Sequence, residues 1–495
     1  MKLLTIGIDG GTKRIIEGMP MPFMQSLLDA SDYRDLNEDL LSRGWAEILT
    51  GCKAEVNKGF YLMPFCDGSY KFNRSYSKNQ MVSESINPPL WKMLNDKGAS
   101  VGFLNVPTTG PADKLEGFIV SGGGGGLNSI SDVPDNMYYP ADIKACLKKN
   151  KYILDIRLPG GASKITDFIN KISSAEKNQT LTFIELAKEK NPDFGFHCFR
   201  MTTEIQYLAR YEIERCIQGI KASNGKGEEF KGESQIQECL LSYYKNLDDN
   251  IKEIFDNLKP DNYIFVADHS TVMYEKDLNL DVWLESRDYL KLMSEFEWFL
   301  TRVKAKLKTK IEYYFKVNEG RAFRVPITKF SKRRTFAFGS FYEIGNSACI
   351  FINDKGRFDG PVKSDRQSID SLVDKICEDF NADPVARDNG LRAKPYRRHF
   401  KNSKHADLFP DIKVCKPDTT YSSSRFWEFI IDNRNLKPFS DDIKNIKYPY
   451  TGIKGSDPLF FYSKGLDECI SPEDPNDLRL PYYMIERYFS KNLGD

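Results

Sequence analysis

The stretch that most constrains the fold is Asp261–Ser270, in which an apolar run ends abruptly in two polar residues. Tyr263–Ala267 is a continuous run rich in aromatic and β-branched side chains. Such a run predicts a strand that is covered on both faces, as strands of largely parallel sheets are. Asp268 and His269 follow at its carboxyl end. Because ligands of open α/β sheets bind outside the carboxyl ends of strands, this position is a candidate functional site.

The amino terminus repeats this pattern. Leu3–Ile8 is a second apolar strand, and it ends in Asp9. Two buried strands, far apart in the sequence, would each deliver a carboxylate to a strand end. Carboxylates and a neutral imidazole are ligands for a divalent ion such as Zn²⁺. The alternative is that Asp268 caps a following helix and that His269 is exposed.

Composition excludes several classes of function. Lys plus Arg number 71 and Asp plus Glu number 70, a net charge of +1 that gives no reason to expect nucleic acid or an anionic membrane as partner. No apolar run reaches the roughly 18 residues of a transmembrane helix. The ten cysteines are scattered without a C-x-x-C pair, which favours reduced thiols and a cytoplasmic protein.

Periodicity along the chain predicts an α/β fold with a mostly parallel central sheet and helices on both faces. The tail after Pro417 has no clear periodicity, so we expect ordered loops there. Further strands are predicted at 99–107, 117–121 and 192–201, and helices at 21–32, 88–97, 368–380 and 204–255, the last interrupted at 223–232.

The order of these segments resembles the alkaline phosphatase superfamily, closest to its type I phosphodiesterase/nucleotide pyrophosphatase and phosphohydrolase–phosphomutase branch. This resemblance implies a single alkaline-phosphatase-like α/β domain over residues 1–495, with inserted cap or accessory segments at about 130–190 and 290–335. The resembling pieces run colinearly and are Ile6–Gly11, Trp45–Gly51, Lys58–Gly59, Leu90–Gly98, Asn105–Pro107, Gly117–Gly122, Val266–His269, Val282–Leu284, Ile352–Arg357 and Phe409–Asp411.

The resemblance also implies a chemistry in which two divalent metals, roughly 4 Å apart, activate a Ser or Thr nucleophile. The ligands of one metal would be Asp9, Asp268 and His269, which suit Zn²⁺, Mn²⁺ or Mg²⁺ to differing degrees. The nucleophile position falls on Leu41, so Ser42 fills the role only if the loop slips by one residue.

The second metal site departs from the family pattern. Its expected ligands fall on Thr203 and Tyr207, and the late histidine expected near residues 332–338 is absent. The sequence therefore predicts a reduced site with one ion or none. Arg43, Lys58 or Arg200 would then supply the positive charge that a second metal normally gives.

Three functions stay open at this point. The first is a phosphoester hydrolase or phosphoryl transferase that acts on a small phosphorylated molecule. The second is a degenerate member that serves as a binding or scaffold protein. The third is an enzyme that uses the same cleft for another group transfer or rearrangement on a phosphorylated or sulfated small molecule. The sequence leaves the oligomeric state open.

Overall fold

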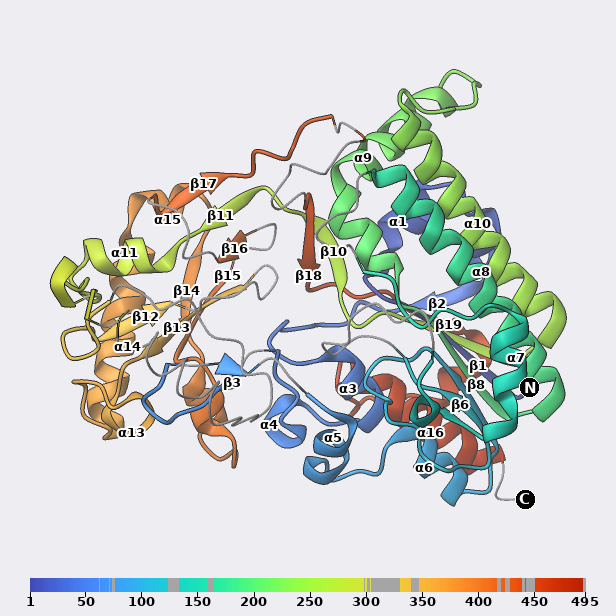
Figure 1. Ribbon diagram of the computed structural model, residues 1–495, viewed down its shortest axis with the longest axis horizontal. Coiled ribbons are helices and arrows are strands. Elements are labelled where there is room, and N and C mark those ends of the chain that lie inside the picture. Colours follow the sequence, from blue (N-terminus) through green and yellow to red (C-terminus); the bar gives the residue numbers. More distant parts are fainter. Residues whose placement is uncertain are drawn as a thin grey trace. The chain divides into compact units, whose positions relative to one another are not determined.

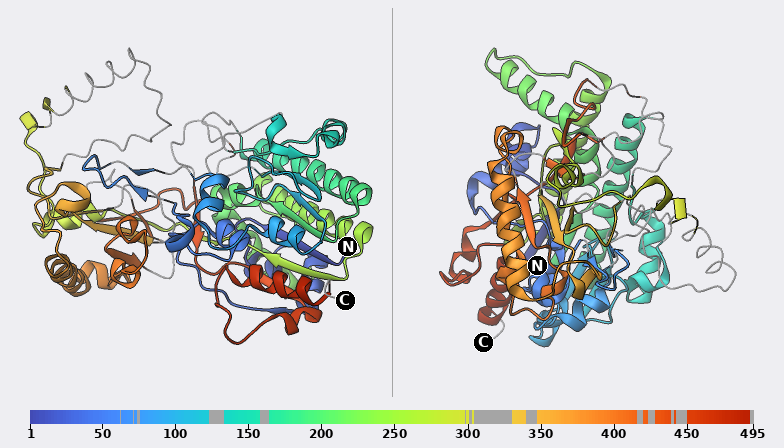
Figure 2. Two further views of the ribbon diagram at one scale, coloured as in Figure 1. Left: turned by 90° about the horizontal axis from the view of Figure 1, so that it is seen from below. Right: turned by 90° about the vertical axis from the view of Figure 1, so that its left-hand side faces the viewer.

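The computed structural model of the chain is shown in Figures 1 and 2. It divides into two compact units, and each is built from segments that are distant in the sequence. The first unit comprises residues 1–59, 76–274 and 434–495, and the second comprises residues 60–75 and 275–433. The structure describes residues 1–61, 63–70, 72–73, 76–122, 133–157, 164–297, 299–300, 303, 330–339, 347–415, 420–422, 428–438, 441 and 450–492.

An eight-stranded sheet forms the centre of the first unit. Its strand order is β2-β19-β9-β1-β8-β5-β6-β7. The five inner strands, from β9 to β6, are parallel, and the outer strands pair antiparallel. The predicted mostly parallel sheet is therefore confirmed. The strands are β1 (Leu3–Ile8), β2 (Ser31–Tyr33), β5 (Val101–Leu104), β6 (Gly117–Val120), β7 (Tyr138–Tyr139), β8 (Phe194–Phe199), β9 (Asn262–Val266) and β19 (Phe460–Ser463).

Helices cover both faces of this sheet because its inner strands alternate apolar side chains between two hydrophobic clusters. On β1, Leu4, Ile6 and Ile8 belong to one cluster and Leu3 to the other. The first cluster includes α1 (Lys13–Gly18), α2 (Pro22–Ala30), α7 (Lys144–Lys149), α8 (Ile165–Lys190), α9 (Thr202–Asn224) and α10 (Gln235–Leu258). The second includes α3 (Gly44–Thr50), α5 (Lys78–Glu84), α6 (Leu90–Asp96) and α16 (Leu480–Asn492).

The long helices α8, α9 and α10 lie side by side on one face (Figure 1). The predicted interruption at 223–232 is confirmed, because α9 ends at Asn224 and α10 begins at Gln235. Ser234 caps α10 by accepting a hydrogen bond from the backbone N–H of Gln237.

The expectation of loops throughout the tail is wrong. Residues 452–455 form β18 (Gly452–Gly455), which pairs antiparallel with β10 (Ser270–Met273). β19 then joins the central sheet beside β9, and α16 packs beneath it in the second cluster. Strands of four residues are too short to reveal a period in the sequence.

The second unit is organised around a four-stranded antiparallel sheet with the order β12-β13-β15-β14. Its α14 (Arg366–Ala382) packs on this sheet. The strands are β12 (Ala337–Gly339), β13 (Ser347–Ile352), β14 (Arg392–Pro395) and β15 (Ile412–Cys415); other elements of the unit are β3 (Met63–Pro64), β4 (Phe72–Asn73), β11 (Lys276–Leu278), α11 (Leu280–Ser286), α13 (Lys355–Phe358), α15 (Pro384–Asp388), β16 (Thr420–Ser422) and β17 (Ile430–Asp432).

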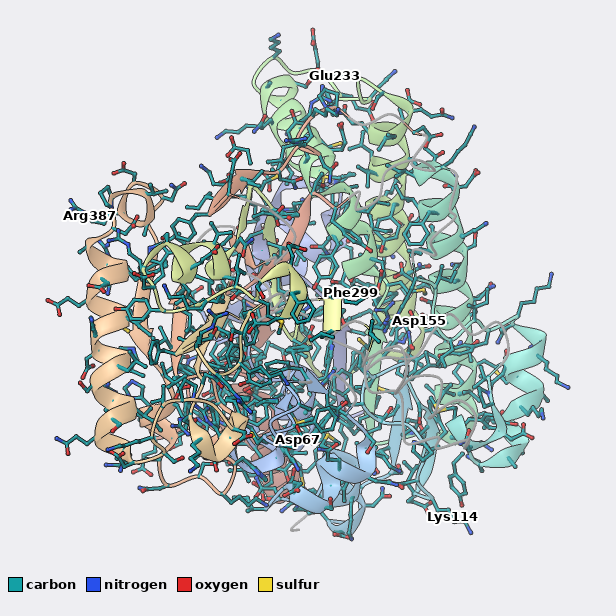
Figure 3. All side chains as sticks on the ribbon, turned by 60° about the vertical axis from the view of Figure 1, so that its left-hand side comes forward. Asp67, Lys114, Asp155, Glu233, Phe299 and Arg387 are labelled. Carbon is teal, nitrogen blue, oxygen red and sulfur yellow. The ribbon has the colours of Figure 1, made fainter. Side chains whose placement is uncertain are left out.

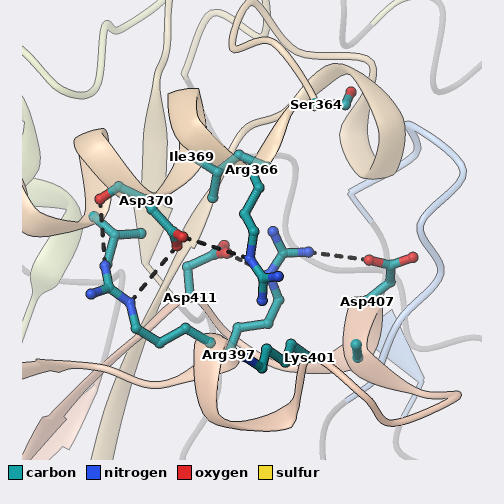
Figure 4. A pocket seen from close by; sticks show the side chains of 11 residues that line it. Ser364, Arg366, Ile369, Asp370, Arg397, Lys401, Asp407 and Asp411 are labelled. Carbon is teal, nitrogen blue, oxygen red and sulfur yellow. Dashed lines mark hydrogen bonds and ion pairs between the residues drawn. The ribbon is translucent and has the colours of Figure 1, made fainter.

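A small surface pocket of the second unit, about 220 Å³ in volume, is shown in Figure 4. Its charged side chains largely pair with one another. Arg397 contacts Asp407 at 3.1 Å and Asp411 at 2.8 Å, and Arg366 and Arg398 each contact Asp370 at 3.8 Å. The pocket is therefore built from ion pairs, and we assign no function to it.

The expected insertions are only partly within the described residues. Residues 165–190 form α8, which packs against the sheet of the first unit, whereas most of 301–329 lies outside the described residues. A capping role for the two segments stays a prediction. Among the helices that the structure describes, none has the length and apolar character needed to cross a membrane.

Candidate functional site

The two predicted strand ends meet in the structure. β1 and β9 are neighbours, and their register pairs Gly7 with Val266. Asp9 and Asp268 each lie two residues beyond this pair, so both carboxylates leave the same edge of the sheet. Arg200 follows β8, the other neighbour of β1, at the same edge.

Asp9, Asp268 and His269 form a compact, buried cluster. Their candidate ligand atoms all lie within 4.8 Å of one another. The Nε2 atom of His269 is 3.5 Å from Oδ1 of Asp9 and 3.7 Å from Oδ1 of Asp268. The three residues are 6%, 3% and 2% exposed. The alternative interpretation is therefore wrong for both residues: β10 and not a helix follows Asp268, and His269 is buried.

Neighbouring groups orient two members of this cluster. The Nδ1 atom of His269 lies 2.7 Å from the carbonyl oxygen of Ser270. A proton on Nδ1 satisfies that carbonyl, and Nε2 faces the two carboxylates. The indole N–H of Trp45 donates to Oδ2 of Asp9 at 3.0 Å. Such outer contacts fix the orientation of metal ligands in proteins.

The donor set fits a divalent cation. Two carboxylate oxygens and an imidazole nitrogen are ligands that Zn²⁺ and Mn²⁺ accept, and the burial removes competing water. Burial alone would raise the pKa of Asp9, but the hydrogen bond and charge of His269 lower it to about 2. Burial and the charge of Asp9 raise the pKa of Asp268. A cation between these carboxylates would offset their repulsion.

The loop before α3 lies directly against this cluster. A Cβ atom on Gly44 would lie 2.4 Å from the carbonyl oxygen of Asp268 and 2.8 Å from its Cβ. Only glycine permits this approach, and Ser42 and Arg43 are the two residues that precede it in the chain. Ser42 is buried, and its N–H donates to Oδ1 of Asp39 at 3.3 Å.

Two predicted cations, Arg43 and Lys58, lie near the start of α3. The N–H of Arg43 donates to the carbonyl oxygen of Gly59 at 2.7 Å, which places Lys58 beside the loop. The guanidinium carbon of Arg43 lies 5.5 Å from the ring centre of Tyr76. Lys58 ends α4 (Ala54–Asn57) in a left-handed conformation with a φ of 59°.

The third predicted cation, Arg200, is committed to carboxylates. It is 4% exposed, it contacts Asp155, and its Nη1 atom lies 3.1 Å from Oε1 of Glu204. Asp155, labelled in Figure 3, is itself buried. Arg200 still helps to lower the pKa of Asp9. A role for Arg200 in binding substrate stays a prediction.

The expected second-metal positions carry neutral side chains that lie near the first cluster. The hydroxyl of Tyr207 is 3.3 Å from Nε2 of His269, and the two rings stack with centres 6.0 Å apart. Thr203 approaches the glycine after Asp9, because a Cβ on Gly10 would lie 3.1 Å from its Oγ1. Burial raises the pKa of Tyr207, which keeps its hydroxyl protonated.

Sequence reasoning missed two residues at the site. The first is Trp45, which orients Asp9. The second is Lys454 on β18, whose Nζ atom lies 3.8 Å from Oδ2 of Asp268. Neither has a local signal, since an aromatic residue in a helix and a lysine in a short strand are common. The other histidine of the central sheet, His197 on β8, is not part of the cluster. Its buried ring stacks on Phe183, and burial lowers its pKa to about 3.

Comparison with one solved structure supports the fold. Phosphonoacetate hydrolase from Sinorhizobium meliloti, solved with phosphonoformate, matches with a TM-score of 0.53 at 13% identity, covering 100% of this chain and 96% of that chain. Murine ectonucleotide pyrophosphatase/phosphodiesterase 5, solved with AMP, matches with a TM-score of 0.42 at 13% identity, covering 93% and 87%. None of the curated proteins compared with this sequence is similar enough to count as a relative.

A family model identifies the family of this chain. The model described as type I phosphodiesterase/nucleotide pyrophosphatase matches residues 3–330. The match includes both strand ends and the α3 loop, which are the segments that build the cluster. This chain belongs to the type I phosphodiesterase/nucleotide pyrophosphatase family, a family of phosphoester hydrolases.

Proposed function

We propose that this protein hydrolyses or transfers a phosphoryl group of a small phosphorylated molecule through a single divalent ion held by Asp9, Asp268 and His269. The observation that carries the proposal is the convergence of these three ligand atoms within 4.8 Å at the ends of adjacent strands. A scaffold would not require this buried arrangement, because two carboxylates in one dry site are costly without a cation.

A bound divalent ion would polarise a phosphoryl oxygen and lower the pKa of an attacking hydroxyl. The chain contributes the geometry around it. Trp45 fixes one oxygen of Asp9, and the Ser270 carbonyl fixes the tautomer of His269. Asp9 and His269 are thus oriented before a metal ion or a substrate binds, which reduces the reorganisation needed during reaction.

Ser42 is the proposed nucleophile. Its support is the contact of Gly44 with Asp268, which holds the loop at the cluster. Deprotonation of a serine hydroxyl needs a nearby cation or base. Arg43, the next residue, would bind the phosphoryl oxygens, because a guanidinium can donate two parallel hydrogen bonds to them. Lys58 would add positive charge from the adjoining turn.

The proposed substrate class is a small phosphorylated, phosphonylated or sulfated molecule. Phosphonoformate bound to the phosphonoacetate hydrolase supports this class, since that protein shares the fold over the whole length of this chain. Tetrahedral oxyanions of phosphorus and sulfur have similar size and shape and are all negatively charged, so a single cationic site would accept either. A substrate screen should therefore include phosphate, phosphonate and sulfate esters.

The first test is the metal content of the purified protein, compared with an Asp268→Ala/His269→Ala variant. We expect about one equivalent in the wild type and none in the variant, with loss of phosphoesterase activity. Asp193→Ala is a matched control, because Asp193 lies before β8 at the opposite edge of the same sheet and bonds Ser100. Its metal content should equal that of the wild type.

Two results would overturn this proposal. About two equivalents of metal in the wild type would indicate an ordinary two-metal enzyme. No metal, even after addition of Zn²⁺ or Mn²⁺, would remove the basis for a metallohydrolase. A binding or scaffold function, or a metal-free group transfer, would then be preferred. One observation favours these alternatives: the hydroxyl of Tyr207 lies within hydrogen-bond distance of Nε2 of His269.

A further inference from the structure

β18 brings a lysine to the site from the far end of the chain. It pairs antiparallel with β10, and the register sets Lys454 opposite Thr271, two residues after His269. The side chain of Lys454 is 20% exposed. Strand pairing therefore fixes the backbone of Lys454 next to the ligand-bearing turn.

A kink in α9 anchors the start of β18. Ala209 has non-helical angles, φ −116° and ψ 22°. Thr451 inserts there: its N–H donates to the carbonyl oxygen of Tyr207 at 2.8 Å, and its hydroxyl donates to that of Leu208 at 2.8 Å. The N–H of Tyr211 donates to the same hydroxyl at 3.2 Å. Because these groups replace intrahelical partners, the helix and β18 are locked together.

The two oxygens of Asp268 face different partners. Oδ1 lies 3.7 Å from Nε2 of His269, and Oδ2 lies 3.8 Å from Nζ of Lys454. One carboxylate can thus serve an ion on the histidine side and the ammonium on the other side.

The charges of the site require such cations. Asp9 and Asp268 together carry two negative charges, which one divalent ion neutralises. A phosphoryl group brings up to two more negative charges, and the neutral Thr203 and Tyr207 cannot offset them. Lys454 places a positive charge 3.8 Å from Oδ2 of Asp268, and a positioned cation stabilises a transferring phosphoryl group.

We propose that the ammonium group of Lys454 binds the phosphoryl group of the substrate and takes over the electrostatic role of a second metal ion. This inference rests on the proposed function, and it extends it to a catalytic residue outside the predicted set. Asp268 would be shared between the ion and the ammonium group of Lys454.

The experiment measures metal content and the binding of inorganic phosphate to the Mn²⁺-loaded protein by calorimetry. Lys454→Met removes the charge at similar length, Lys454→Arg keeps it, and Lys92→Met is a control on the exposed face of α6. We expect Lys454→Met to retain one metal and to bind phosphate about 100-fold more weakly. Lys454→Arg should recover part of the affinity, and Lys92→Met should bind like the wild type.

The outcomes separate this inference from the proposed function. If Lys454→Met keeps its metal and binds phosphate with unchanged affinity, the lysine has no such role, whereas the single-metal proposal stands. If the wild type binds two metal ions, the lysine does not replace one. If the wild type binds no metal, both fail together. Thermal unfolding of each variant identifies misfolding, and in that case Lys454→Arg decides: affinity lost despite a native fold and retained charge contradicts the inference.

Discussion

The hydrogen bond from Trp45 to Asp9 provides the sharpest test of how the site is built. Trp45→Phe keeps an aromatic ring against Phe196, whose ring centre lies 6.2 Å away, but removes the donor. Asp9 then loses the contact that orients its carboxylate. We expect the affinity for Zn²⁺ or Mn²⁺ to fall 10- to 100-fold, the usual effect of losing an outer contact of a metal ligand, or about 1.4–2.7 kcal/mol.

Stability should fall as well, because the lost hydrogen bond ends on a charged group and the smaller ring leaves a space. We expect about 2–4 kcal/mol less free energy of unfolding. Trp91→Phe is a matched control. Trp91, which belongs to α6, is also buried. Its indole N–H donates to Oδ2 of Asp113 at 2.9 Å and not to a residue of the Asp9–Asp268–His269 cluster.

The assay is competition for Zn²⁺ against a chromogenic chelator, with urea unfolding in parallel. Both variants should lose comparable stability, but only Trp45→Phe should lose metal affinity. An unchanged affinity in Trp45→Phe would refute the role of the indole. An equal loss in Trp91→Phe would show that general destabilisation, and not the orientation of Asp9, controls the metal.

Two further predictions concern Gly44 and Glu176. Gly44→Ala should abolish stoichiometric metal binding and cost about 1–3 kcal/mol of stability, because its Cβ would displace the backbone of Asp268, whereas Gly225→Ala, with no heavy atom closer than 3.6 Å, should do neither. Metal analysis and urea unfolding check both, and a normally loaded Gly44→Ala protein would show that this contact is not needed. Burial raises the pKa of Glu176 from 4.5 to about 8. The folded state therefore binds more protons than the unfolded state within that window, and wild-type stability should fall as pH rises through it, by up to about 1.4 kcal/mol per pH unit. Glu176→Gln, which can still accept the hydrogen bond of Tyr243, should remove this slope, so its unfolding midpoint should exceed that of the wild type at pH 8.5 but not at pH 4.5. Parallel pH profiles of the two proteins would contradict the assignment.

The central sheet could be predicted because its strands have a clear local pattern in the sequence. β1 and β9 are apolar runs that end in a charge, and this local pattern also located Asp9, Asp268 and His269. Their convergence followed from the rule that parallel strands present their carboxyl ends at one edge. Family membership, inferred from the order of segments, is confirmed by the match over residues 3–330.

The remainder of the site depends on contacts that no local pattern encodes. Lys454 lies 186 positions from Asp268 in the sequence and meets it only through the pairing of β18 with β10. The kink of α9 has no proline or glycine to mark it, since it arises from the insertion of Thr451. The roles of Ser42, Arg43 and Lys58 stay predictions.

The placement of Lys454 has a consequence for the order in which the site is assembled. During synthesis, Asp9, Asp268 and His269 all leave the ribosome before the 159 residues from 275 to 433, which form most of the second unit, and β18 comes later still. Domains fold as units while the chain is made. Because β18, β19 and α16 belong to the first unit, that unit is complete only after residues 434–495 have been made. The proposed metal ligands and Lys454 would therefore be brought together in one late step, since the segment that carries Lys454 also supplies the strand beside β9.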